Sequence, residues 1–355
     1  MKIKKIQAYL QSLPLTKPYS IAYQTISDVD LVFLDIELEN GIVGRGSASP
    51  AEFVVGENAR QTFSNLQSSF VQDLTGRDIR LFQEIIYETT KQSPDFPGTV
   101  AAVDLALHDA FCKFLGISVA AFYGQKVQAL PTSVTIGIKS VPETLQEAEG
   151  YYASGFKILK VKTGRNLDED LERVIKLHER FRGNMKIRVD ANQGYRLNEL
   201  KKFIEVTRNL SLELIEQPLP VGKEQELLCL DDADRSLLAA DESIKGPAAA
   251  LVYSCRPQPF HIYNIKLMKC GGIAGAMDIA RIALHAGIDL FWGCNDESII
   301  SITAALHAAY CCANTRYIDL DGSFDILEST VRGGFTLRDG LMLINDKPGF
   351  GVELP

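Results

Sequence analysis

The sequence predicts an α/β fold in which a (β/α)8 barrel of the TIM type follows a smaller α+β domain that caps it. The chain has 355 residues, which leaves room for a second domain beside a barrel of about 250 residues. β-rich runs and helical stretches fill its first third, and after Pro131 short β-branched runs alternate with helical stretches. We expect a capping and specificity domain at 1–125, the catalytic barrel at 126–325, and strands at 326–355 that return to the capping domain.

The capping domain is predicted to open with an antiparallel sheet. Residues 3–10, 31–39 and 42–47 are β-rich, and Asn40-Gly41 between the last two runs favours a type I′ hairpin turn. From about 58 to 115 the apolar spacing becomes helical. One helix face collects the large apolar side chains near the end of that stretch, namely Val100, Val103, Leu107, Phe111 and Leu115.

Eight strands are predicted for the barrel. Continuous apolar runs are typical of parallel strands buried on both faces, and eight is the number that closes a barrel. An open, doubly wound sheet is the alternative, but it has fewer strands and a glycine-rich phosphate loop, which the sequence lacks. Residues 335–337 and 340–344 are expected to add strands to the N-terminal sheet. The predicted barrel strands are 132–138, 156–162, 185–190, 212–216, 237–241, 260–266, 288–293 and 316–320.

Composition narrows the class of protein. The net charge of -8 and the lack of a basic cluster argue against a nucleic-acid or anionic-membrane partner and favour a small-molecule substrate. The N-terminus lacks the apolar core of a signal peptide and no run is long enough to span a membrane, so we expect a cytoplasmic protein. Seven cysteines without a C-x-x-C pair argue against disulfides and a cysteine-built zinc site.

Charged residues end five consecutive predicted strands. They are Lys162, Asp190, Glu216, Asp241 and Lys266, separated by 28, 26, 25 and 25 residues. Each step is one strand-helix unit, and the C-termini of barrel strands meet at one face, so the five side chains are predicted to share one pocket. The alternative is that charges simply mark where strands meet solvent. The order of charges, three acids flanked by lysines, favours a functional site.

The three acids, Asp190, Glu216 and Asp241, are predicted to hold one Mg²⁺ per subunit. Carboxylates packed together repel unless a cation lies among them, and an all-oxygen set suits Mg²⁺, with Mn²⁺ as a substitute and zinc disfavoured. The ion would bind a substrate carboxylate and stabilise the enediolate formed when the adjacent C–H bond breaks.

Lys162 and Lys266 are then predicted to carry protons. A lysine acts as a base only when its pKa falls from its ordinary value of about 10.4, and a nearby cation and partial burial both lower it. Lys160 lies two residues before Lys162 and points to the same side of the strand. We expect Lys160 to depress the pKa of its neighbour and to help hold the substrate carboxylate.

Several motifs resemble a known family in order and spacing. Phe156-Lys-Ile-Leu-Lys-Val-Lys162, Asp190-Ala-Asn192, Glu216-Gln-Pro218, Asp241-Glu-Ser243 and Lys266-Leu-Met-Lys-Cys-Gly-Gly272 are similar to the barrel motifs of the enolase superfamily, in its muconate-lactonizing-enzyme subgroup. Residues 102–109 and 113–116 resemble the helix that caps these barrels, so the resemblance covers the whole chain.

The resemblance implies an enolase-like, modified barrel with a capping domain, and Mg²⁺ on the three carboxylates. It implies Lys162 and Lys266 as an acid/base pair on opposite faces of the enolate. Two bases that face each other suit an epimerase, because one removes the proton and the other returns it to the far face. The resemblance also implies a homo-oligomer.

Asp319-Leu-Asp321 resembles the Asp-x-Asp motif of dipeptide epimerases, where it pairs with the substrate's α-ammonium group. An acidic turn in solvent is the alternative. Thr135 is also placed in the substrate site. Residues 293–298 resemble the strand-seven segment and supply Cys294, Asp296 and Glu297, although Asn295 and Asp296 stand where relatives often carry apolar residues.

Residues 14–25 resemble the mobile lid that sets specificity. Relatives that act on Ala-Glu carry an arginine where this chain has Gln24, which argues against a glutamate substrate. Lid residues Tyr19, Ile21 and Tyr23, together with a second loop at 53–55, favour a hydrophobic second residue, as in Ala-Ala, Ala-Val or Ala-Leu.

Other functions stay open on the same scaffold, namely an N-acylamino acid racemase, an o-succinylbenzoate synthase or a muconate cycloisomerase. A binding protein that keeps the metal but not the chemistry is a further alternative, against which the two lysines argue. Lys269 is expected to lie at the surface or to anchor a loop, and Gly271-Gly272 to allow a close backbone approach or only a turn. Structural roles are expected for the histidines at 108, 178, 261, 285 and 307.

Overall fold

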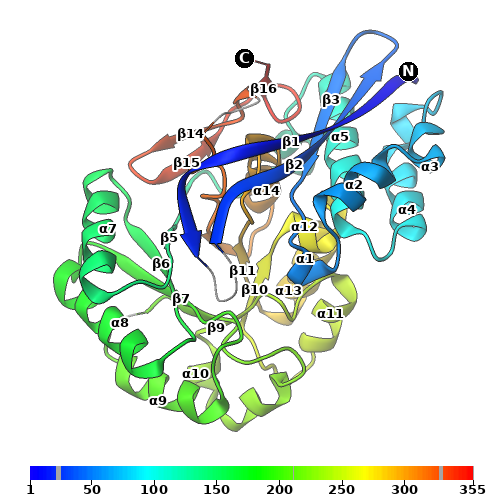
Figure 1. The fold of residues 1–355 in the computed structure, drawn as a ribbon. Coiled ribbons are helices and arrows are strands. Elements are labelled where there is room, and N and C mark those ends of the chain that lie inside the picture. The colour runs from blue at the N-terminus through cyan, green and yellow to red at the C-terminus, as the bar shows by residue number, and fades with distance from the viewer. Residues whose placement is uncertain (21–24, 211, 328–330, 355) are drawn as a thin grey trace.

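The computed structural model describes residues 1–20, 25–210, 212–327 and 331–354, and Figure 1 shows their arrangement. A ring of strands surrounded by helices forms the larger part. A three-stranded sheet and a group of helices lie beside it, and β1 and β2 extend from this sheet toward the ring. The predicted barrel with a capping domain is therefore confirmed. No helix in the described part is long and apolar enough to cross a membrane.

The capping sheet has the order β1-β2-β3, with strands Ile3–Ser20, Thr25–Leu38 and Val43–Ala48. Neighbouring strands are antiparallel, as the hairpin prediction requires. The turn between β2 and β3 is longer than a two-residue type I′ turn, since Leu38 N donates to Ile42 O at 2.8 Å. Within it Gly41 takes a φ of 84° and Asn40 does not have a positive φ.

Helix α5 (Pro97–Leu115) covers the sheet, as its apolar face predicts. It packs closely on β3 because Gly44 and Gly46 have no side chains, and a Cβ at either position would overlap the α5 backbone. Asp109 on α5 accepts hydrogen bonds from Arg45 N on β3 and from Phe350 N near the C-terminus, both at 2.8 Å. The other helices of this domain are α1 (Glu52–Val55), α2 (Ala59–Leu66), α3 (Ser69–Gln72), η1 (Ile79–Leu81), α4 (Phe82–Gln92) and α6 (Val119–Tyr123).

The barrel sheet runs in sequence order from β5 to β12, and its neighbouring strands are parallel. A parallel bridge between Thr132 and Ile318 joins the first and last strands and closes the ring. The observed strands lie within or beside the predicted runs. They are β5 (Val134–Ile136), β6 (Ile158–Lys162), β7 (Lys186–Asp190), β8 (Leu214–Glu216), β9 (Leu238–Ala240), β10 (Ile262–Ile265), β11 (Asp289–Trp292) and β12 (Thr315–Ile318).

Helices follow the first seven of these strands, but none in the described residues follows β12, so the eighth strand-helix unit lacks its helix. A single turn, α12, also stands between β10 and its outer helix α13. The barrel helices are α7 (Val141–Ala153), α8 (Leu167–Phe181), α9 (Leu197–Thr207), η2 (Glu224–Cys229), α10 (Asp232–Arg235), α11 (Pro247–Tyr253), α12 (Leu267–Cys270), α13 (Ile273–Ala286) and α14 (Ile299–Tyr310).

The chain returns to the N-terminal sheet at another place than the one expected. Leu15 on β1 pairs with Ile326, and Thr16 N donates to Asp325 O at 2.7 Å. The later strands β14 (Phe335–Arg338) and β15 (Leu341–Ile344) pair instead with β4 (Leu130–Pro131). Tyr310 holds β15 beside β4, because its hydroxyl accepts a hydrogen bond from Leu130 N and donates one to Met342 O. Two further short strands, β13 (Arg332–Gly333) and β16 (Val352–Glu353), pair with each other.

Candidate active site

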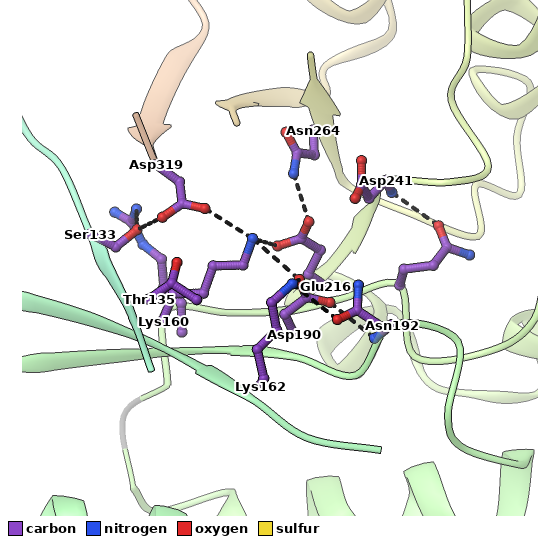
Figure 2. A network of polar contacts seen from close by, with 12 residues as sticks. Ser133, Thr135, Lys160, Lys162, Asp190, Asn192, Glu216, Asp241, Asn264 and Asp319 are labelled. Atoms are coloured by element: carbon purple, nitrogen blue, oxygen red, sulfur yellow. Dashed lines mark hydrogen bonds and ion pairs between the residues drawn. The ribbon is translucent and has the colours of Figure 1, made fainter. Parts of the chain in front are cut away.

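The five charged strand ends meet at one face of the barrel. Lys162 is opposite Asp190 in the β6–β7 register, and Asp190 is opposite Glu216 in the β7–β8 register. Asp241 and Lys266 directly follow β9 and β10, the next two strands of the ring. Figure 2 shows side chains from these strands directed toward one another. The predicted pocket therefore exists as a cluster of acids and lysines.

Lys162 forms one wall of this cluster. Its Nζ lies 2.7 Å from Asp190 Oδ2 and 3.0 Å from Asn192 Oδ1. Asn192 N donates to the other oxygen of Asp190 at 2.9 Å, which the left-handed φ of Asn192, 41°, permits. Burial would raise the pKa of Asp190, but Lys162 and Lys160 outweigh it and hold this pKa at about 2.

Lys266 forms the opposite wall. Its Nζ lies 2.8 Å from Asp241 Oδ2. Burial lowers the pKa of Lys266, but the Asp241 carboxylate outweighs it, so this pKa stands above its ordinary value. The expectation of a lowered lysine pKa is thus not met at Lys266 in the protein alone, because its nearest charge is an acid and not a cation.

Lys269 is buried, so of the two roles expected from the sequence the surface position is wrong and the anchoring role fits. Its Nζ contacts Asp241 Oδ1 and donates to the backbone oxygens of Asp241 at 2.5 Å and Asn264 at 3.0 Å. Burial lowers the pKa of Lys269. The two oxygens of Asp241 are therefore shared between Lys266 and Lys269.

Glu216 lies between the two walls and is fully buried. Asn264 Nδ2 donates to its Oε1 at 2.6 Å, while Oε2 lies 2.8 Å from Lys160 Nζ without an aligned hydrogen bond. Burial and then the neighbouring Asp190 raise the pKa of Glu216 to about 8.

Lys160 is buried, whereas its expected role of helping to hold the substrate carboxylate needs an accessible ammonium group. Its Nζ is 2.9 Å from Asp319 Oδ2 and 3.2 Å from Asp190 Oδ2, in addition to its contact with Glu216. Burial alone would lower the Lys160 pKa, but Asp319, Glu216 and Asp190 raise it well above its ordinary value. Its partners in this structure are protein carboxylates, so it stabilises the acidic cluster directly.

The Asp-x-Asp pair lies at the end of β12, beside β5. Asp319 is buried and accepts a hydrogen bond from Ser133 Oγ at 2.5 Å. Asp321 is only partly buried, and its Oδ2 accepts from the backbone N of Thr135 at 2.8 Å. Burial and then Asp319 raise the pKa of Asp321 to about 7. Cys294 Sγ lies 4.0 Å from Asp321 Oδ1, so Thr135, Cys294, Asp319 and Asp321 are brought together.

The segment after β11 connects the site to the capping domain. Asn295 Nδ2 donates to Ser49 O at 2.9 Å, and Glu297 accepts from Asn295 N at 2.9 Å. Glu297 is buried, and burial raises its pKa to about 7, whereas Asp296 is only partly buried. Three of the lid residues named from the sequence, Ile21, Tyr23 and Gln24, lie outside the described residues.

Several polar residues of the site did not emerge from the sequence. Arg188 and Asn264 are buried in the barrel, two residues before Asp190 and Lys266 respectively. Arg188 donates to Ser133 Oγ at 3.1 Å and to Ile318 O at 2.6 Å. Because strand side chains alternate, reading two positions back from each strand end finds both of them. Glu242, also missed, is buried with its Oε2 unpartnered within the described residues.

The donor set of the site fits Mg²⁺. Asp190, Glu216 and Asp241 offer only carboxylate oxygens, which Mg²⁺ prefers, and Glu216 Oε2 is a buried oxygen without an aligned hydrogen bond. Among the described residues no three acidic, imidazole or thiol side chains stand close enough to enclose a metal ion, and ammonium groups lie between these carboxylates. The three carboxylates are the residues that would hold the ion.

Comparison with known proteins covers nearly the whole chain. Residues 5–124 match the family model described as mandelate racemase / muconate lactonizing enzyme, N-terminal domain, and residues 143–355 match enolase C-terminal domain-like. The L-Lys-D/L-Arg epimerase of Desulforapulum autotrophicum is 49% identical over 99% of both chains.

Two solved structures illustrate the range of relatives. The dipeptide epimerase from Methylococcus capsulatus, complexed with Mg and the dipeptide L-Arg-D-Lys, has 45% identity and a TM-score of 0.97 over 99% of both chains. The dipeptide epimerase from Enterococcus faecalis, complexed with Mg and L-Leu-L-Tyr, has 31% identity and a TM-score of 0.92 over 99% of this chain and 100% of that one.

Proposed function

Because this chain belongs to the enolase superfamily, in its mandelate racemase and muconate lactonizing enzyme group, and is an isomerase, we propose that it is a Mg²⁺-dependent dipeptide epimerase. It inverts the α-carbon of the C-terminal residue by 1,1-proton transfer. The observation that carries the proposal is the placement of Lys162 and Lys266 on opposite walls of one acidic pocket.

Strand order places the two lysines across the ring. Lys162 ends β6 and Lys266 follows β10, and β7, β8 and β9 lie between them in a ring of eight. Each ammonium nitrogen contacts a different carboxylate, at 2.7 and 2.8 Å. An α-carbon held between them presents one face to each lysine. The neutral lysine takes the α-proton, and the protonated lysine on the other side delivers its own proton to the opposite face.

The metal site supplies the remaining electrostatics. Asp190, Glu216 and Asp241 would hold the divalent cation, whose charge would offset the carboxylate that raises the Lys266 pKa and would stabilise the negative charge developing on the substrate carboxylate. Lys162 and Lys266 then hold and move the proton.

The substrate's free ammonium group is assigned to the acidic end of β12. Asp321 is partly exposed and lies next to the buried Asp319, so a cation bound there meets two carboxylates. This pairing favours a free-amine dipeptide over an N-acylated amino acid, which has no such charge.

We infer that the preferred dipeptide carries cationic side chains rather than the hydrophobic second residue expected from the lid. The relative from Desulforapulum autotrophicum is named for L-Lys and D/L-Arg, and the 45% identical structure holds L-Arg-D-Lys. The relative that holds L-Leu-L-Tyr is only 31% identical. Asp296, a partly buried acid in the segment after β11, supports the same choice through its charge.

A panel of substrates in D₂O with Mg²⁺ tests the proposal. L-Lys-L-Arg, L-Arg-L-Lys, L-Ala-L-Leu, L-Ala-L-Glu and N-succinyl-L-Lys are incubated separately, and mass spectrometry reports deuterium at the α-carbon while chiral chromatography reports epimer ratios. We expect fastest exchange and inversion with the cationic dipeptides. Fastest turnover of L-Ala-L-Leu restores the hydrophobic alternative, and turnover of N-succinyl-L-Lys alone contradicts dipeptide epimerisation.

A further inference from the structure

A buried carboxylate of the capping domain contacts the barrel beside Lys266. Asp104 on α5 is fully excluded from solvent. Its Oδ1 accepts from Ile273 N at 2.7 Å and its Oδ2 accepts from Ala274 N at 3.1 Å. These are the first amides of α13, which have no partner within their own helix. Asp104 therefore supplies, from the other domain, the N-terminal cap that α13 lacks.

The segment between Lys266 and α13 is short and rests on α5. Lys266 directly precedes the single turn α12, and Gly271 and Gly272 lead from it into α13. Gly272 has a φ of 94°, and a Cβ there would lie 2.5 Å from Asp104 Oδ1. A Cβ at Gly271 would lie 3.0 Å from Val100 Cγ1 on the same helix. The two glycines thus allow the close backbone approach on which the cap depends.

The other side of α12 is held by the barrel. Lys269 reaches from α12 to Asp241 and to the backbone oxygen of Asn264. Ser49 N, from the capping domain, contacts Met268 Sδ at 3.3 Å. The turn that directly follows Lys266 is therefore held between α5 and the Asp241 carboxylate.

Asp104 is itself fixed in orientation within the capping domain. His108 Nδ1 lies 3.2 Å from Asp104 Oδ1 and 2.9 Å from Asp104 O. The second ring nitrogen of His108 lies 2.7 Å from the hydroxyl of Tyr123 on α6. The carboxylate therefore points at α13 from a rigid support, since Asp104 and His108 are both fully buried.

We propose that Asp104 is a positioning residue for Lys266, and that the capping domain thereby sets the geometry of one of the two proton carriers. Lys162, by contrast, is held by Asp190 and Asn192 of the barrel. Weakening the cap should thus impair proton transfer on one face of the substrate and spare the other. This inference rests on the proposed two-base function.

Asp104→Asn is the test variant. The amide keeps the size of the side chain, but its NH₂ group cannot accept, so one α13 amide loses its partner. The L,L- and L,D-epimers of the best dipeptide are each incubated in D₂O, and initial α-proton exchange is measured from each. Lys162→Ala and Lys266→Ala first assign each epimer's proton to one lysine. We expect Asp104→Asn to slow exchange on the Lys266 face by about tenfold to a hundredfold, with the Lys162 face within about twofold.

Asn58→Ala provides the matched control. Asn58 caps α2 in the same domain by accepting from Gln61 N at 3.0 Å, away from α12. It should lower stability without changing the ratio of exchange between the two faces. Amide hydrogen exchange gives a second readout, in which a peptide covering 266–276 should lose protection in Asp104→Asn and keep it in Asn58→Ala.

The outcomes separate the two claims. Equal loss on both faces, or unchanged protection of 266–276 with an unchanged face ratio, overturns the positioning role while wild-type activity leaves the epimerase proposal standing. Absence of exchange from every dipeptide in the wild-type protein overturns the proposed function, and the positioning role falls with it.

Discussion

Lys160 Nζ lies 2.8 Å from Glu216 Oε2, at a depth where the two residues are only 3% and 0% exposed. The same ammonium group contacts Asp190 and Asp319. The Lys160 ammonium group is thus the shared partner of three buried carboxylates at the base of the site. Removing one partner of a buried ion pair strongly destabilises the folded protein.

Lys160→Met should therefore destabilise the metal-free protein by about 3–5 kcal/mol, because the carboxylates are left without their buried cation. Mg²⁺ should restore part of this loss by binding the same acids, by about 2.7 kcal/mol at a hundredfold excess over its dissociation constant. Urea unfolding with EDTA or with Mg²⁺ measures both effects.

Lys202→Met is the control for this prediction, because Lys202 pairs with Asp168 at 2.8 Å on the surface and both side chains are exposed. It should cost no more than about 1 kcal/mol, with or without Mg²⁺. A similarly small loss for Lys160→Met would contradict the structural role of the buried cation.

Asp321→Asn should lower kcat/KM on a free-amine dipeptide by about tenfold to a hundredfold, because a charge-assisted hydrogen bond to the substrate ammonium is weakened. An exposed acid on α8, Asp168, provides the matched change in Asp168→Asn, which should have no effect. Steady-state kinetics on the dipeptide decides the matter. Unchanged kcat/KM in Asp321→Asn would favour the alternative function, an N-acylamino acid racemase.

Asp296→Asn should reduce the preference for a cationic first residue. Loss of the carboxylate that we propose binds the first side chain is expected to lower kcat/KM for L-Lys-L-Arg by about tenfold, while L-Ala-L-Arg, which has no charge on its first side chain, is unaffected. The ratio of the two values is the measurement. An equal decrease for both substrates indicates a general effect on the loop rather than recognition of the cation.

His307 gives the protein a pH-dependent stability far from the acids of the site. It is fully buried on α14, and Nδ1 accepts from Ala120 N at 3.1 Å, while Nε2 has no hydrogen-bond partner within the described residues. Burial lowers its pKa to about 3. Below its ordinary pKa of about 6.5, the unfolded chain binds a proton that the folded chain does not. The contribution of His307 is therefore complete above this pH and is lost as the pH falls toward 3.

Replacing His307 with Gln, which keeps an acceptor but does not titrate, should flatten this dependence. Between pH 6 and 4 the wild-type free energy of unfolding should fall by about 1.4 kcal/mol per pH unit more than that of His307→Gln. Urea unfolding at several pH values measures the slopes. His285→Gln, at an exposed position on α13, should keep the wild-type slope, and identical slopes in His307→Gln would contradict the prediction.

The sequence predicted the barrel well because its strands carry two signals at once. Continuous apolar runs marked the strands, and the predicted C-terminal ends at 162, 190 and 216 coincide with those of β6, β7 and β8. The charged residues that end these runs lie at one face, because the C-terminal ends of all the strands of a barrel meet there. Their catalytic and metal-binding roles stay predictions.

Tertiary contacts account for what the sequence did not give. A surface position and a loop-anchoring role both stayed open for Lys269, because nothing in its neighbours reveals that α12 folds its ammonium group back onto Asp241. The raised pKa of Lys266 has the same origin, since it depends on a distance to Asp241 and not on spacing along the chain. The chain was expected to return to the N-terminal sheet at 335–337 and 340–344, but it does so earlier, where Ile326 pairs with Leu15. This pairing is an isolated bridge, which leaves no strand pattern in the sequence.

Asp109 has a consequence for the order in which the protein can be made. Its carboxylate joins Arg45 N, from the third strand, to Phe350 N, which follows the barrel strands in the sequence. A nascent chain that has exposed only the capping domain carries this carboxylate with one of its two backbone donors still inside the ribosome. Synthesis proceeds from the N-terminus, so the first domain to emerge completes its hydrogen bonds only after the whole barrel has been synthesised.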